Sequence, residues 1–136
     1  MTLTDTGPLV ALINTVDQHH ARCAAALAAL PAEPLLTSWP CFTEAMHLLW
    51  RGGGYRYQAA LWDMYRDGRL VLHELTAAEI LRMTRLMERY RDTPMARADA
   101  SLVAAAETLG LRRVFTVDGQ FYVYRLGDGS ALAVVP

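Results

Sequence analysis

Apolar and polar positions along the chain switch between a two-residue period and a period of three to four residues, which predicts strands and helices in turn. Short β-prone runs predict strands at residues 2–4, 35–37, 69–73, 113–116 and 131–135. Longer runs with helical spacing predict helices at residues 8–13, 18–30, 39–51, 55–65, 77–90 and 98–109. Strands that alternate with helices are typical of an α/β fold built on a parallel sheet.

Several element ends are predicted by local chemistry. Asp17 is expected to cap the helix at 18–30, which Pro31 would end. The run Gly52-Gly53-Gly54 is expected to stop the helix at 39–51. Thr76 and Glu79 have the spacing of a capping box and predict the start of the helix that follows them.

Four acidic residues occupy positions where a parallel sheet usually binds its ligand, beyond the carboxyl ends of the strands. Asp5 follows the first predicted strand and Asp118 follows the fourth. Asp99 lies in the first turn of the helix at 98–109, and Glu44 lies early in the helix after the second strand. The predicted topology can therefore bring four acids from distant parts of the chain to one edge of the sheet.

Each acid taken alone also has a purely structural interpretation. Asp5 can cap the helix that follows it, and Asp99 can favour a helix N-terminus. Asp118 precedes a glycine, which is an ordinary turn pair. A helical wheel places Glu44 on the polar side of its helix, opposite a wide apolar face, where a solvated side chain is expected. The functional hypothesis therefore depends on the set of four and not on any one of them.

The basic residues limit what could neutralise such a set. All 13 basic side chains are arginine, so any mechanism that needs a catalytic lysine is excluded. Three carboxylates close together repel one another, and at least one then tends to stay protonated. The compensating charge must come from arginine, from protons or from a divalent cation. Oxygen ligands favour Mg²⁺ or Mn²⁺ over zinc or copper.

Composition adds expectations about partners and location. A net charge of −1 gives no broad attraction to nucleic acid, so a polyanionic substrate needs a local arginine patch or a metal. Apolar residues make up 53% of the chain, above the ~45–50% of an average domain, and we expect part of this surplus to face a partner. No apolar run approaches the ~18 residues of a membrane span, and no signal peptide is recognised. We expect a cytoplasmic protein that makes no membrane contact.

Four motifs appear along the chain in a familiar order. They are Asp5 with a small residue after it, Thr43-Glu44, the segment ADASLVAAA at residues 98–106, and the segment FTVDGQF at residues 115–121. Together they make the sequence resemble the PIN-domain nucleases, and within them the VapC-type toxins of bacterial type II toxin–antitoxin systems. The resemblance spans nearly the whole chain. It implies a single PIN-like domain over residues 1–136, with a central parallel sheet of about five strands flanked by helices in three layers.

The resemblance also implies an activity and a site. Asp5, Glu44, Asp99 and Asp118 would be the catalytic and metal-binding acids, with Thr116 as a nearby hydroxyl that takes part in substrate binding. The implied function is endoribonuclease cleavage of RNA phosphodiester bonds that depends on Mg²⁺, with Mn²⁺ as an alternative ion. The implied partners are the RNA substrate, a cognate antitoxin protein and a second copy of the chain in a homodimer. Gly7 is a small departure, because the family often has serine or another small residue at that position.

Other interpretations stay open at this stage. Arg97, next to Asp99, can contact a substrate phosphate because guanidinium matches its geometry, or it can form an intramolecular pair. The tryptophans Trp39, Trp50 and Trp62 are assigned to the core or a dimer interface rather than to base stacking, and the pair His19-His20 to the surface. The alternative functions are a non-catalytic PIN-like interaction scaffold and a PIN nuclease that acts outside any toxin system.

Overall fold

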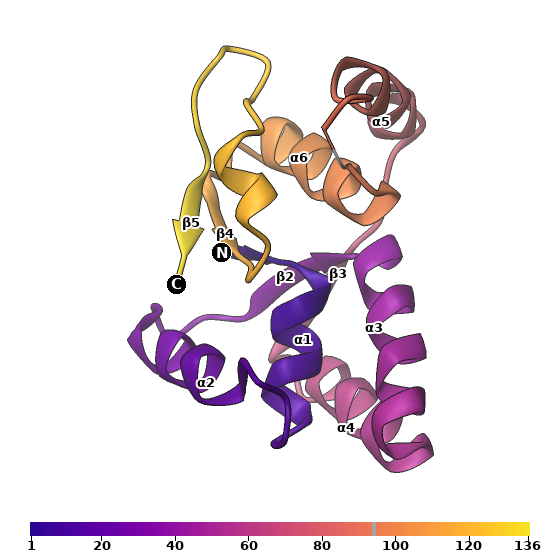
Figure 1. The fold of residues 1–136 in the computed structure, drawn as a ribbon, viewed down its shortest axis with the longest axis vertical. Helices are drawn as coiled ribbons and strands as arrows, with labels where there is room; N and C mark the ends of the chain where they lie inside the picture. Colours follow the sequence, from indigo (N-terminus) through magenta and orange to yellow (C-terminus); the bar gives the residue numbers. More distant parts are fainter. Residues whose placement is uncertain (94) are drawn as a thin grey trace.

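A fully parallel sheet forms the centre of the molecule (Figure 1). The computed structural model describes residues 1–93 and 95–136. The strands are β1 (Thr2–Thr4), β2 (Leu35–Ser38), β3 (Leu70–His73), β4 (Arg113–Phe115) and β5 (Ala133–Val135). They lie in the order β3-β2-β1-β4-β5, and every pairing is parallel. β1 is therefore central, with Leu3 in register with Leu36 on one side and Val114 on the other.

Helices cover both faces of the sheet, so the molecule has three layers (Figure 1). The helices are α1 (Thr6–Ile13), α2 (His20–Ala29), α3 (Trp39–Gly53), α4 (Tyr55–Arg66), α5 (Ala77–Arg89), α6 (Arg97–Leu109) and the short 3-10 helix η1 (Gly119–Tyr122). One face packs against α1 to α4 and the other against α5 and α6. The predicted α/β fold with a parallel sheet of five strands is confirmed.

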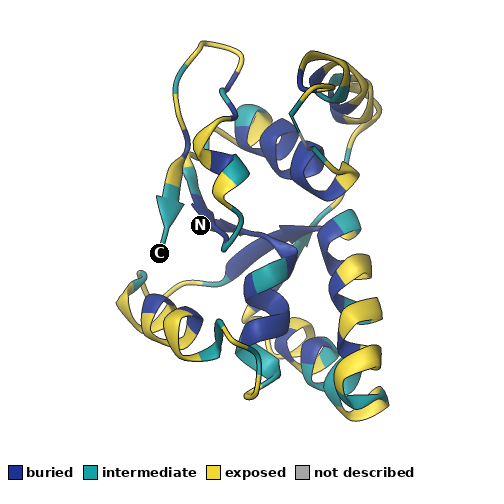
Figure 2. Cartoon of the chain, in the orientation of Figure 1, coloured by how far each residue is buried: buried dark blue, intermediate teal, exposed yellow. Residues whose placement is uncertain are grey.

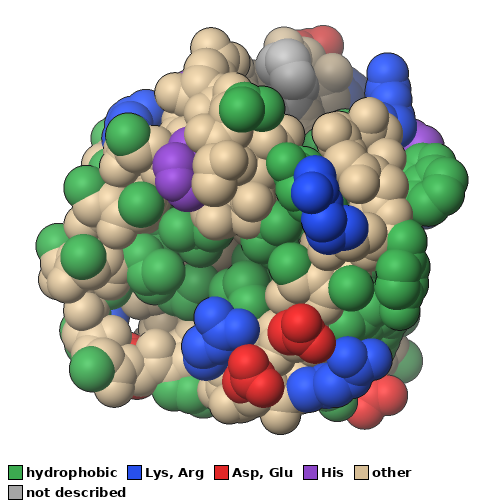
Figure 3. Space-filling view, turned by 90° about the horizontal axis from the view of Figure 1, so that it is seen from below, with side chains coloured by type: hydrophobic (Ala, Val, Ile, Leu, Met, Phe, Trp, Pro, Cys, Tyr) green, Lys and Arg blue, Asp and Glu red, His purple; other side chains and the backbone are tan. Residues whose placement is uncertain are grey.

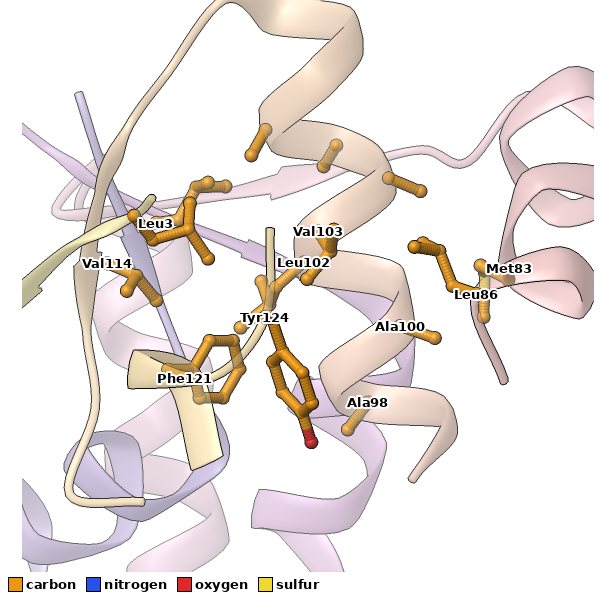
Figure 4. Close-up of a cluster of buried hydrophobic side chains, with 14 of the residues drawn as sticks. Leu3, Met83, Leu86, Ala98, Ala100, Leu102, Val103, Val114, Phe121 and Tyr124 are labelled. Atoms are coloured by element: carbon orange, nitrogen blue, oxygen red, sulfur yellow. The ribbon is translucent and has the colours of Figure 1, made fainter. Parts of the chain in front are cut away.

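Two hydrophobic clusters hold these layers together. The first joins the sheet to α5 and α6, and it contains Leu3, Leu86, Val103, Phe121 and Tyr124 (Figure 4). The second joins the other face to α1 through α4. β1, β2 and most of β4 are buried, as is α6 from Ala98 to Ala106, whereas β5 at the sheet edge is partly exposed and α2, α3, α4 and α5 each expose one side (Figure 2). The buried length of α6 explains its small residues, because alanine lets the helix approach the sheet closely.

Two helix starts differ from the prediction. α1 begins at Thr6 rather than at residue 8, because the Asp5 side chain accepts a hydrogen bond from the Thr6 backbone N–H at 2.8 Å and caps the helix there. α2 begins at His20 with His19 as its N-cap. Asp17 accepts a hydrogen bond from the His19 backbone N–H at 2.8 Å, so it stabilises the turn before the helix and is not the cap.

Two other ends also differ. α3 continues through Gly52 and ends at Gly53, with Gly54 as its C-cap, whose φ of 72° suits glycine. β5 begins at Ala133 rather than at residue 131. The capping box of α5 is present as predicted, with Thr76 and Glu79 bonded reciprocally.

None of the helices in the described residues combines the length and apolarity that a membrane crossing requires.

Candidate active site

All four predicted acids line one cleft, which we call the acid cleft. Its volume is about 610 Å³, and it lies beyond the carboxyl ends of β1 and β4. Its lining residues are Asp5, Thr6, Gly7, Val10, Asp17, His19, Glu44, Leu48, Ala96, Asp99, Val117, Asp118 and Gly119. The fold therefore gathers the acids as the strand topology predicted, from segments as far apart as residues 5 and 118.

Asp5 forms the floor of the acid cleft and is held at both carboxylate oxygens. It follows β1 directly and is 6% exposed. Its Oδ1 accepts the Thr6 backbone N–H at 2.8 Å, and its Oδ2 accepts the Thr116 hydroxyl at 2.8 Å. Thr116 Oγ1 also accepts the Asp118 backbone N–H at 3.0 Å. Thr116 is 2% exposed and binds two of the acids from beneath the cleft.

Asp99 is the second buried acid, at 8% exposure, in the first turn of α6. Its Oδ2 accepts the Tyr124 hydroxyl at 2.9 Å. Tyr124 follows η1, and its ring lies beside the N-terminal half of α6 with the hydroxyl directed toward that end of the helix (Figure 4). The ring packs edge-on against Tyr90 and Phe121, with centroids 5.1 and 5.2 Å away. This packing fixes the hydroxyl, and the hydroxyl in turn fixes the Asp99 carboxylate.

Asp118 and Glu44 lie nearer to solvent. Asp118 is half-buried and caps η1, with its Oδ1 accepting the Gln120 backbone N–H at 2.9 Å. Glu44 is exposed on α3, and its Oε2 accepts the Thr6 hydroxyl at 3.4 Å. The polar-side position that the helical wheel gave Glu44 thus faces the acid cleft.

Burial and mutual repulsion raise the pKa values of the two buried acids. For Asp5, burial is the largest cause, and the charges of Asp99 and Asp118 add to it, so that its pKa rises to about 6 although Thr116 and the Thr6 amide oppose the shift. For Asp99, burial again comes first, and the charges of Asp118 and Glu44 raise its pKa further against the Tyr124 hydrogen bond. Among the described residues, none of the four acids forms an ion pair. The site therefore concentrates negative charge without a protein cation to balance it.

This donor set fits a hard divalent cation in its chemistry. Carboxylate oxygens from four segments surround one cleft, and Mg²⁺ and Mn²⁺ prefer such ligands. Within residues 1–93 and 95–136, however, no group of three or more acidic, histidine or cysteine side chains is already gathered around a single point. The hydrogen bonds to Thr116, Tyr124 and the Gln120 amide hold the carboxylates individually. Side-chain rotation is needed before several of them could share one ion.

Arg97 lies outside the acid cleft, in a second depression that adjoins it. We call this depression the Trp39 groove. It has a volume of about 520 Å³ and is lined by Trp39, Pro40, Thr43, Glu44, His47, Ala96, Arg97 and Ala98. Glu44 and Ala96 line both spaces, so the two are continuous. Arg97 is exposed and pairs with no carboxylate in the described part of the chain, so it does not form the intramolecular pair that the sequence left open.

Two residues of the site were missed by sequence reasoning. His19 was assigned to the surface, yet it lines the acid cleft from the start of α2, whereas its neighbour His20 is bonded through Nδ1 to the Ala11 carbonyl at 2.7 Å. The position of His19 directly before a predicted helix was the available signal that its side chain could reach the sheet edge. Tyr124 had no signal, because its bond to Asp99 joins positions 25 residues apart that share no periodic pattern.

The comparisons with known proteins agree with this architecture. A scan against family models found no match, and a search of curated protein sequences found none either. Among solved structures, the chain is similar to VapC20 of Mycobacterium tuberculosis, a toxin that cleaves the sarcin–ricin loop, with a TM-score of 0.85, 22% identity and full coverage of both chains. It is also similar to FitAcB from Neisseria gonorrhoeae, with a TM-score of 0.62, 23% identity, and coverage of 100% of this chain and 97% of that one. The chain therefore has the fold of these two structures, the three-layer fold that its resemblance to PIN domains implied.

Proposed function

We propose that the chain is a metal-dependent endoribonuclease that hydrolyses RNA phosphodiester bonds with Mg²⁺ or Mn²⁺ and is the toxin of a toxin–antitoxin pair. One observation carries the proposal: four carboxylates from four segments line one cleft, and in the described residues no cation of the protein pairs with any of them. The likeness in fold to VapC20, a toxin that cleaves RNA, supports the choice of substrate.

Asp5, Asp99 and Asp118 would hold the metal, with Glu44 as a ligand directly or through water. A bound dication lowers the pKa of a bound water and stabilises the charge that develops on phosphate. The chain's own residues prepare the site for it. Thr116 orients Asp5 and Asp118 together, and Tyr124 orients Asp99. We propose this orienting role for Thr116, and its contact with substrate, which the resemblance implies, stays a prediction.

A cleavage assay with and without metal tests the proposal. We expect the purified protein to cleave RNA in Mg²⁺ or Mn²⁺ and to lose this activity in EDTA. We also expect either ion to raise the melting temperature, since a ligand at ~100 times its dissociation constant stabilises the folded state by about 2.7 kcal/mol. A protein that neither binds these ions nor cleaves any RNA in their presence would contradict the nuclease assignment.

A non-catalytic PIN-like scaffold is the second candidate, and one observation favours it. The acids are individually hydrogen-bonded, and in the described residues they do not form a preassembled metal site. The same metal titration separates the two candidates, because a scaffold gains no stability from Mg²⁺ or Mn²⁺. A nuclease that acts outside any toxin system would cleave RNA equally well, and the absence of an antitoxin reading frame beside the coding region would favour it.

We further propose that the chain forms a homodimer and binds an antitoxin through its exposed apolar side chains. Trp50 is 57% exposed and Tyr55 66% exposed, on the adjoining ends of α3 and α4. On the underside of the molecule, apolar side chains surround a hollow, with arginine and acidic side chains along one edge (Figure 3). Light scattering of the chain alone, and together with the product of a neighbouring small reading frame, measures both associations.

A further inference from the structure

The Trp39 groove joins the acid cleft along Glu44 and Ala96, and it differs from the cleft in chemistry. The acid cleft is lined by carboxylates, which repel a polyanion. The groove instead offers an aromatic face, an arginine and a histidine, and Glu44 is its one acid among the described residues. An RNA strand that reaches the acid cleft can therefore make favourable contacts in this groove.

Trp39 is presented in a way that suits stacking. Its side chain is 43% exposed although it follows β2 directly. The two residues before it, Thr37 and Ser38, are fully buried, and Ser38 Oγ is hydrogen-bonded to Ser101 Oγ of α6 at 2.6 Å. Ser38 also caps α3, whose first residue is Trp39. The backbone beneath the indole is thus anchored to both the sheet and α6.

The indole is also braced from one side. Phe42 packs against it edge-on, with ring centroids 5.5 Å apart and an interplanar angle of 79°. Phe42 is 2% exposed and packs in turn against Trp62, with centroids 4.9 Å apart. An aromatic ring held in this manner loses little conformational entropy when a second flat group stacks on it. Other exposed aromatic residues, such as Trp50 and Tyr55, do not line either space.

Arg97 completes the groove as a phosphate contact. It begins α6, two residues before Asp99, and no carboxylate in the described residues occupies its guanidinium. His47 lies one turn along α3 from Thr43 and lines the same groove. A guanidinium and an aromatic face in one groove are the combination that single-stranded nucleic-acid sites use to bind backbone and base together.

We propose that the Trp39 groove is the binding subsite for an unpaired nucleotide that flanks the scissile phosphate, with its base stacked on Trp39 and its phosphate on Arg97. The proposal rests on the ribonuclease function proposed above and adds the class of substrate. Paired bases in an A-form duplex are stacked inside the helix and cannot offer a free face, so the subsite selects single strands and loops. The groove's volume of about 520 Å³ lies within the range of ~300–1,000 Å³ that ligand pockets span.

Cleavage kinetics on a short RNA of mixed sequence without secondary structure test the stacking. Because base stacking on an aromatic side chain contributes several-fold to over a hundredfold in affinity, we expect Trp39→Ala to raise KM about tenfold with a smaller change in kcat. Trp39→Phe should recover most of the loss. Tyr65→Ala is the control, since it removes an exposed aromatic side chain of α4 that lines neither the groove nor the acid cleft, and it should leave the kinetics unchanged.

The substrate provides a second test that does not alter the protein. Single abasic nucleotides on either side of the cut should slow the wild-type protein at one of the two positions. They should add no further loss in Trp39→Ala, since the base and the indole act as one pair. Arg97→Gln should reduce the slope of log affinity against log salt by about 1, whereas Arg85→Gln on α5 should not.

The outcomes test the proposed subsite and the proposed nuclease function independently of each other. If the wild-type protein cleaves RNA and Trp39→Ala behaves like Tyr65→Ala on intact and abasic RNA, the proposed subsite is wrong and the nuclease function is retained. If the RNA binds in a Trp39-dependent manner, by quenching of tryptophan fluorescence, but is never cleaved, the subsite stands and the nuclease is wrong. If Trp39→Ala changes only repression by a partner protein, the groove is a protein-docking surface and the proposal is overturned.

Discussion

The four predicted acids of the cleft form two pairs with different surroundings. Asp5 and Asp99, the buried pair, are 6% and 8% exposed, and each accepts a hydroxyl hydrogen bond from a side chain behind it. Glu44 is exposed and Asp118 half-buried, and we call these two the rim pair. All four carry the same chemical group, so the differences between the pairs come from the positions that the fold gives them.

The comparison shows that the buried pair, and not the rim pair, lowers the stability of the folded protein. Burial raises the pKa of both Asp5 and Asp99. The charge of Asp118 raises both pKa values further, while Asp99 adds to the rise for Asp5 and Glu44 to the rise for Asp99. Carboxylates at the rim lie closer to water, which screens their charge. In the metal-free protein, the buried pair therefore opposes folding whenever it is ionised. A functional site that reduces stability in this way is expected where activity requires the charge.

The largest expected effect comes from neutralising one member of the buried pair. Asp99→Asn removes a metal ligand and should reduce RNA cleavage by at least about 1,000-fold. The same substitution relieves repulsion while keeping an oxygen that can accept the Tyr124 hydroxyl, so the metal-free protein should gain about 0.5–2 kcal/mol in free energy of unfolding. Cleavage assays, and urea unfolding in EDTA, measure the two effects.

Glu44→Gln is the matched control for this comparison, because it removes the same charge at the rim. We expect it to reduce cleavage but to change the metal-free unfolding free energy by less than about 0.5 kcal/mol. Equal gains in unfolding free energy in the two variants would show that a charge in the buried pair destabilises the metal-free protein no more than a charge in the rim pair. A less stable Asp99→Asn protein would show that the hydrogen bonds of the Asp99 carboxylate outweigh the repulsion it experiences.

The pH dependence of stability is the next largest effect. The folded-state pKa of Asp5 is raised above the usual value of 3.8 to about 6, so the folded protein binds more protons than the unfolded chain between these values. Stability contributed by this group is complete at low pH and is lost as the pH rises toward 6 and above it, by about 3 kcal/mol. The raised pKa of Asp99 acts in the same direction. Chemical unfolding in EDTA at a series of pH values measures the slope.

Asp5→Asn should flatten this slope, and saturating Mg²⁺ or Mn²⁺ should reverse it. Ions bind the ionised carboxylates, so metal stabilisation grows as the pH rises through the same range. An unchanged slope in Asp5→Asn would assign the titration to another group. Asp63→Asn, which neutralises an exposed acid of α4, serves as a control for charge removal in general.

The sequence predicts the sheet and the four acids well, because both depend on local patterns. Apolar runs at regular intervals give β1 to β4 nearly residue by residue, and each acid has a fixed place relative to a strand end. Trp39 was predicted less well. A helical wheel puts it on the apolar face of α3, yet it is 43% exposed, because that face is wider than the area the sheet and neighbouring helices can cover.

The hydrogen-bond partners behind the acids were not predictable in the same way. Tyr124 reaches Asp99 only because η1 turns the chain back over α6, and its ring packs on Tyr90 and Phe121. Such contacts depend on three-dimensional packing, which a single sequence does not encode in any spacing. Helix starts were wrong for a related reason, since the Asp5 cap depends on one side-chain rotamer.

A substitution with a smaller expected effect tests the hydrogen bond that orients Asp99 of the buried pair. Tyr124→Phe removes the hydroxyl that Asp99 accepts at 2.9 Å while keeping the ring in its cluster. Because residues that orient metal ligands contribute about 10–100-fold, we expect cleavage to fall about tenfold, with a weaker affinity for Mn²⁺ in calorimetry. The loss of one buried hydrogen bond should lower stability by about 1 kcal/mol.

Tyr90→Phe provides the control from the same aromatic cluster. Its hydroxyl accepts the Arg125 backbone N–H at 2.9 Å and is not bonded to any of the four acids among the described contacts. We expect a similar loss of stability with unchanged cleavage and metal affinity. Equal activity losses in the two variants would indicate that Tyr124 acts through the packing of the cluster and not through Asp99.

The smallest effect concerns the rim and Gly7, where the resemblance to PIN domains leads one to expect serine. A Cβ at residue 7 would lie 2.6 Å from Cγ2 of Val117, the residue before Asp118. Gly7→Ala should therefore displace the loop that carries Asp118 and lower cleavage about threefold, which corresponds to ~0.6 kcal/mol. Val117→Ala in the same chain should restore the activity, because it removes the methyl group that the new Cβ meets. Gly119→Ala should leave cleavage unchanged, because its added Cβ meets nothing within 4 Å. If Gly7→Ala is equally silent, Val117 moves aside freely and the close approach of α1 to this loop does not position the rim pair.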